Sequence, residues 1–235
     1  MGKQQNKKPQ DNIKAMKKDD FVKKIPKIDI LSWKEAYTII HAFCYSDTKI
    51  NLNEIKQMLS LKDKDLVDLF LSTYILFDDN DKAYLELFIN ENLDHEDTAF
   101  ISDLLYFATD WSLNINYLKV LNIIEKQAKD ENYVVLGAIN YIANTIKYYY
   151  IEEIVRSFNR VVNTKDYFQS EQILASISLY RITAKESYLD FIAELIDHDK
   201  DNLVFLTNVL REKSYQEAYF DLSEIKVRFL NKYHV

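Results

Sequence analysis

The chain of 235 residues is poor in the two residue types that make sharp turns. It contains two glycines and two prolines, and beyond Lys27 only Gly137 remains of these four. Hairpin turns and phosphate-binding loops depend on both types, because glycine adopts positive φ angles and proline fixes its own φ. Their scarcity excludes most β architectures, the nucleotide-binding loops and the nucleophile elbow. We therefore expect an all-α protein whose helices are joined by polar turns.

Cysteine and long apolar runs are also scarce. With Cys44 alone, no internal disulfide can form and zinc sites of the C-x-x-C type are excluded. The best candidate for a membrane span, residues 66–77, is interrupted by Asp68 and is shorter than the roughly 18 apolar residues that a span needs. The N-terminus has no apolar signal core. These features predict a cytoplasmic protein.

Charge is distributed unevenly along the chain. The net charge is −7, but residues 1–27 contain nine lysines and three aspartates, so this segment carries +6 and the remainder carries −13. An acidic body favours basic partners and repels phosphate backbones, so we do not expect it to bind nucleic acid. Residues 1–31 are predicted to be a flexible, Lys-rich tail and linker that could contact an anionic surface.

The body contains a repeating pattern. A first helix is predicted over residues 32–45, because Ser32 and Glu35 have the spacing of a capping box. Beyond it, a Tyr followed by Leu or Ile recurs at spacings of 33, 33 and 38 residues, and an Asp that could open the next helix recurs every 32 to 36 residues. The tyrosines are Tyr84, Tyr117, Tyr150 and Tyr188, and the aspartates are Asp65, Asp97, Asp130, Asp166 and Asp201. The two markers interleave, so each unit is predicted to be two helices joined by a polar turn.

This two-helix period resembles the HEAT and armadillo class of α-solenoid over residues 52–213, although the proline that often opens a HEAT helix is absent. The resemblance implies a short right-handed solenoid of stacked helix pairs, forming a single domain over residues 32–235. Capping helices are expected at residues 32–45 and at about 214–233, because the apolar ends of a solenoid must be covered.

Two side-chain patterns imitate metal sites. His41 and Cys44 share one face of a helix, and Asp197, Asp199 and Asp201 alternate as in the opening of a calcium loop. Two ligands are too few for a stable site, and the glycine and glutamate that a calcium loop needs later are missing. We therefore predict a packed cysteine and a helix cap, with no metal, no cofactor and no catalytic residue.

The second helices of the units are predicted to carry the binding surface, because in solenoids of this class such helices commonly line the concave groove. The resemblance implies an acidic groove bearing tyrosine and asparagine. Its predicted residues are Asp103, Tyr106, Asp110, Tyr133, Gly137, Asn140 and Asn144. Ordinary solvation and packing between repeats would explain the same residues.

The chain is similar to immunity proteins of bacterial toxin systems, which are small, acidic and helical. That similarity implies a non-enzymatic module that binds a basic protein, such as a toxin. A DNA glycosylase of the HEAT-like class is the alternative, with Asp110, Trp111 and Arg156 or Arg160 as its matching residues, but arginine is scarce and the body is acidic. A third hypothesis is an adaptor whose basic tail docks on a membrane or on nucleic acid.

Overall fold

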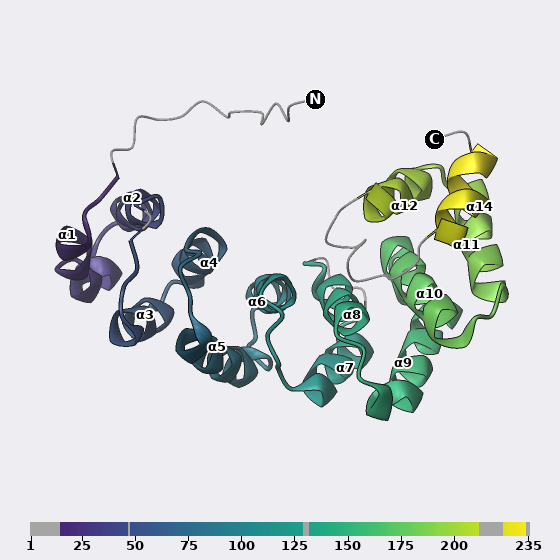
Figure 1. Ribbon diagram of the computed structural model, residues 1–235, viewed down its shortest axis with the longest axis horizontal. Coiled ribbons are helices and arrows are strands. Elements are labelled where there is room, and N and C mark those ends of the chain that lie inside the picture. The colour runs from purple at the N-terminus through teal and green to yellow at the C-terminus, as the bar shows by residue number, and fades with distance from the viewer. Residues whose placement is uncertain (1–14, 47, 129–131, 212–222, 234–235) are drawn as a thin grey trace. The chain divides into compact units, whose positions relative to one another are not determined.

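The protein is all-α over the residues that the computed structural model describes, which are 15–46, 48–128, 132–211 and 223–233 (Figure 1). This confirms the fold class expected from the scarcity of glycine and proline. Contacts divide the chain into two compact units, residues 1–88 and 89–235, where the sequence predicts one domain over 32–235. The boundary lies inside a helix, α5 (Asp79–Asn92), so no loop in the sequence marks it.

Unit 1 begins with short helices and continues with longer ones. Besides most of α5, its elements are α1 (Lys18–Val22), the 3-10 helix η1 (Ile25–Ile30), α2 (Trp33–Cys44), α3 (Leu52–Leu59) and α4 (Lys64–Thr73). The predicted capping box is confirmed: the Ser32 hydroxyl accepts from the amide of Glu35, whose carboxylate accepts from the amide of Ser32 at 3.1 Å. Asn51 and Glu54 form a second capping box at the start of α3. Helix α2 packs on α1 and α4.

The segment that precedes Ser32 is helical over residues 18–22 and 25–30, where the sequence predicts a flexible tail and linker. Phe21 is fully buried and stacks on Phe43 of α2, with ring centroids 3.9 Å apart. Ile25 and Ile28 are buried as well. These three apolar residues recur at helical spacing, whereas the high lysine content of the segment is typical of a flexible tail. Residues 1–14 of the predicted tail lie outside the described residues.

Unit 2 consists of paired helices. They are α6 (Thr98–Asp110), α7 (Tyr117–Lys126), α8 (Val134–Asn144), the 3-10 helix η2 (Tyr148–Tyr150), α9 (Ile151–Asn163), α10 (Gln169–Thr183), α11 (Ser187–His198), α12 (Asp201–Arg211) and α14 (Ser223–Tyr233). Figure 1 shows α6, α8, α10 and α12 following one another in one row, with α7, α9 and α11 in a second row. Helix α8 packs on α6, α7 and α10, and α10 packs on α8, α9, α11 and α12. These helices therefore contact elements one or two positions along the chain.

The unit that begins at the marker Tyr117, predicted to be two helices, is observed as α7 and α8. The Asn116 side chain accepts from the amide of Lys119 and caps α7, and every residue of α8 from 134 to 143 is buried. The marker tyrosines Tyr117 and Tyr150, which open consecutive first helices, stack at 5.2 Å with their rings only 7° apart. The 33-residue spacing between them thus corresponds to a direct contact.

The aspartate marker is confirmed at one helix and displaced at others. Asp97 caps α6 by accepting from the amides of residues 99 and 100. Asp63 takes this role at α4 in place of Asp65, because its side chain reaches the free amides of the first turn. Asp199 accepts from the amide of Asp201 at the start of α12, two residues before the predicted position. The last two shifts occur where two or three acids stand close together, so spacing alone does not identify the cap. Asp130 lies outside the described residues.

Helix α14 occupies the last part of the predicted C-terminal cap helix. The guanidinium of Arg228 forms ion pairs with Glu186 and Asp190 at the start of α11. The hydroxyl of Tyr233 donates to the carboxylate of Asp197 at 2.9 Å. These contacts place α14 on α11, while residues 214–222 of the predicted helix lie outside the described residues.

Candidate functional site

The seven residues predicted to line a groove lie on or beside α6 and α8, which pack against each other. Asp103 and Asp110 are exposed on α6, and Tyr106 between them is half-buried. Tyr133 immediately precedes α8 and is 54% exposed, with a positive φ of 58°. These four residues are at least partly accessible.

Two of the seven residues lie inside the protein. Gly137 faces α6, and a Cβ added there would lie 3.4 Å from the Cβ of Leu105 and 3.5 Å from the ring of Tyr106. Asn140 is only 7% exposed, and the side chain of Asn144 donates to its carbonyl and to its amide oxygen. Every residue of α8 from 134 to 143 is buried, as expected for a helix that is apolar on all sides. Gly137 and Asn140 therefore serve packing between helices.

The accessible residues of α6 form one acidic stripe, because Asp103, Tyr106 and Asp110 are spaced by three and four residues. Partial burial raises the pKa of the Asp110 carboxyl above its usual range. The negative end of the helix dipole acts in the same direction, since Asp110 is the last residue of α6. Within the described parts of the chain, Asp110 has no ion-pair partner, so its carboxylate is available to a cation from outside.

Unit 1 carries a similar stripe on α4, which the sequence analysis did not identify. Asp65 is exposed and Asp68 is half-buried, one helical turn apart, and Ser72 extends the same face. Burial, and to a smaller extent the charge of Asp65, raises the pKa of Asp68. No ion pair to Asp68 is formed by the residues that the structure covers. The sequence feature that could have identified this stripe is the pair of acids on the polar face of an otherwise apolar helix.

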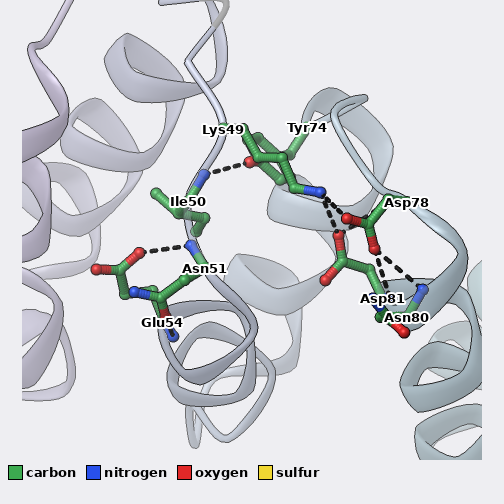
Figure 2. Close-up of polar contacts among 8 residues, drawn as sticks. All are labelled: Lys49, Ile50, Asn51, Glu54, Tyr74, Asp78, Asn80 and Asp81. Carbon is green, nitrogen blue, oxygen red and sulfur yellow. Dashed lines mark hydrogen bonds and ion pairs between the residues drawn. The ribbon is translucent and has the colours of Figure 1, made fainter.

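A polar cluster in unit 1 joins the turn before α3 to the turn before α5 (Figure 2). Lys49 forms ion pairs with Asp78 and, at 3.2 Å, with Asp81. Asp81 is only 3% exposed. The amide of Asp78 donates to the carboxylate of Asp81 at 2.9 Å, so the turn is closed by its own side chains. The Tyr74 hydroxyl accepts from the amide of Ile50 at 2.7 Å. All these groups are paired, which indicates a structural role.

The imitations of metal sites serve other purposes. Burial raises the pKa of the Cys44 thiol to about 11, so it stays protonated, which confirms a packed cysteine. The ring of His41 stacks on Tyr37 at 5.5 Å and contacts Tyr45 at 4.8 Å. Among the residues described, no group of three or more His, Cys, Asp or Glu side chains is arranged to hold a metal ion.

Large apolar side chains are exposed at several other places. Tyr148 and Tyr149 of η2 are 86% and 73% exposed, and the sequence did not predict them as surface residues of interest.

The residues that match a glycosylase-like site lie on different helices. Arg156 and Arg160 are exposed on α9, which packs on α7 and α10, whereas Asp110 is the last residue of α6. No helix in the described part of the chain is both long enough and apolar enough to cross a membrane.

Comparison of the chain with models of protein families, with curated proteins and with solved structures gives no significant match. The resemblances to HEAT repeats and to immunity proteins therefore stay predictions. Any functional assignment depends on the surface chemistry described above.

Proposed function

We propose that the protein is a non-enzymatic binding module of the α-solenoid type, whose acidic helix faces bind a basic protein. The observation that carries the proposal is two accessible carboxylates, half-buried Asp68 on α4 and exposed Asp110 on α6. Each has a raised pKa and no cation beside it among the described residues. A lysine or arginine of a partner would form the ion pair that each of these carboxylates lacks.

Contacts between successive second helices support the solenoid part of the proposal. Three contacts link neighbouring helix starts: the Asn132 side chain donates to the Thr98 hydroxyl at 2.8 Å, the rings of Tyr133 and Phe168 lie 6.1 Å apart, and Asn202 donates to Gln169 at 2.7 Å. The residues in each contact are 33 to 35 positions apart. An array in which each repeat touches mainly its neighbours has this pattern. The proposed capping helices are α2 and α14.

A basic toxin is the partner class that the similarity to immunity proteins suggests. The net charge of −13 beyond residue 27 would accelerate association with any basic protein by electrostatic attraction, an effect that salt screens. Exposed aromatic rings such as that of Tyr133, which is 54% exposed, would then provide contact area.

The test compares the protein with two sets of variants. Asp68→Asn and Asp110→Asn, singly and together, remove the unpaired charges without changing side-chain shape. The control Glu125→Gln plus Glu194→Gln removes two exposed charges from first helices. The proteins are immobilised, exposed to an extract of the source cells, and each retained protein is then purified for kinetic measurements at several salt concentrations.

The expected result is a strongly basic protein that the control retains and the double Asn variant loses, with an association rate that falls steeply as salt is added. Single variants show which unit contributes. Retention that is insensitive to salt, or equal for the double variant and the control, would overturn the proposal.

A further inference from the structure

A lysine-lined depression lies in unit 1 at the junction of α1 and η1. Its lining consists of Ala15, Met16, Lys17, Asp20, Lys23, Lys24 and Lys27. None of the four lysines forms an ion pair with a described residue, in contrast to Lys49 in the same unit. Four lysines and one aspartate therefore line a single concave surface, within a chain whose net charge is negative.

The geometry of η1 aligns an apolar residue with these lysines. In a 3-10 helix, side chains three residues apart lie above one another, so Lys24, at the cap of η1, shares an edge with Lys27 and Ile30. Ile25 and Ile28 form a second edge, which is buried. Ile30 is 81% exposed, so an aliphatic side chain is available on the same edge as Lys24 and Lys27.

This surface is held in place by the rest of unit 1. Phe21 stacks on Phe43 directly beneath α1, and the amide of Met16 donates to the carbonyl of Ala42 at 3.0 Å. The Asp29 side chain accepts from the amide of Lys62 at 3.1 Å, which fastens the end of η1. The basic edge is therefore displayed on a folded scaffold.

We propose that the lysine-lined depression, together with Ile30 beside it, is a peripheral binding site for a bilayer containing anionic lipids. The lysines would attract acidic headgroups, and Ile30 would enter the boundary between headgroups and acyl chains. An aliphatic side chain cannot stack on a base or form a hydrogen bond with it, so Ile30 favours a lipid surface over nucleic acid. The inference is independent of the acidic stripes on α4 and α6.

The test measures co-sedimentation of the full chain with two kinds of vesicle, one of phosphatidylcholine and one of an equimolar mixture of phosphatidylcholine and phosphatidylserine. The first variant replaces four lysines by glutamine: Lys17→Gln, Lys23→Gln, Lys24→Gln and Lys27→Gln. The control has the same charge change at four exposed lysines of unit 2: Lys126→Gln, Lys165→Gln, Lys185→Gln and Lys200→Gln. The third variant is Ile30→Ser. Circular dichroism verifies that each variant is folded.

We expect binding to the mixed vesicles alone. Each lysine removed from the depression should weaken binding by about fivefold, and Ile30→Ser should weaken it by about tenfold. The control should lose much less. Equal losses for the two lysine variants, or an unchanged affinity for Ile30→Ser, would overturn the proposal. So would displacement from the vesicles by a single-stranded oligonucleotide that the Ile30→Ser variant binds equally well, because that result assigns the lysines to nucleic acid.

Discussion

Individual tyrosine hydroxyls fasten turns of this protein that contain neither glycine nor proline. Tyr141 is fully buried, and its hydroxyl donates to the carbonyl of Leu113 at 2.8 Å and accepts from the amide of Ile115 at 3.1 Å. Tyr74 holds the amide of residue 50, and Tyr167 holds the carbonyl of residue 124 at 2.9 Å. Some of the 17 tyrosines thus satisfy backbone groups in connections that are closed to water.

Tyr141→Phe should lower the free energy of unfolding by about 1–3 kcal/mol, because it leaves a buried amide and a buried carbonyl without their partner. Urea denaturation followed by circular dichroism measures the loss. The control is Tyr148→Phe, which removes a hydroxyl from a side chain that is 86% exposed and should change stability little. Equal stabilities of the two variants would show that the Tyr141 hydroxyl is replaceable by water.

The carboxylates of Asp110 and Asp78 should give opposite pH dependences. Burial raises the folded-state pKa of Asp110, so its favourable contribution is present below the unfolded pKa of about 4 and is lost as the pH rises through the folded pKa. Asp110→Asn should therefore be at least as stable as the wild type at neutral pH and lose this advantage in acid.

The hydrogen bond from Lys49 lowers the pKa of Asp78, so its contribution is present above the unfolded pKa and is lost as the pH falls through the folded pKa. Asp78→Asn should destabilise the protein at neutral pH, and the difference should shrink in acid. Melting temperatures across the acidic range test both signs. Parallel curves for the two variants would contradict the assignment.

At the scale of helices, Gly137 lies in the contact between α6 and α8. A Cβ at this position would make ordinary van der Waals contact with Leu105 and Tyr106. Gly137→Ala should therefore be tolerated and should stabilise the protein by up to about 1 kcal/mol, since alanine favours the helix. Gly137→Val adds two methyl groups to a closed contact and should cost about 1–3 kcal/mol. Chemical denaturation of both variants measures these changes, and a stable valine variant would mean that the two helices separate easily.

Helix positions could be predicted from the sequence more fully than helix surroundings. Ser32 with Glu35 and the aspartate marker at Asp97 predicted two helix starts, and the 33-residue spacing predicted the pair α7 and α8. Asp103, Tyr106 and Asp110 share a face because helical spacing requires it. The burial of Gly137 and Asn140 could not be predicted, because a sequence does not show which neighbour covers a helix. The folded segment around Phe21 could not be predicted either, because its many lysines are typical of a flexible tail.

At the scale of the whole molecule, the order of contacts predicts uneven stability. Helix α8 packs on three other helices and α10 on four, whereas α1 packs on α2 and η1, and α14 is held on α11 by surface ion pairs and a hydrogen bond. Elements with fewer packed neighbours open locally at a lower free energy. Native-state hydrogen exchange should therefore be slowest in α8 and α10 and faster in α1 and α14. Uniform protection would indicate a single cooperative unit.

The two tryptophans are divided between the two units, with Trp33 at the start of α2 and Trp111 at the end of α6. Trp33 is 51% exposed, while Trp111 is half-buried beside Phe107, at a ring distance of 6.0 Å. Replacing either one by phenylalanine leaves an intrinsic fluorophore that reports on one unit alone. Unfolding, lipid contact and partner contact can thus be assigned to residues 1–88 or to residues 89–235 by emission spectroscopy, without an added label.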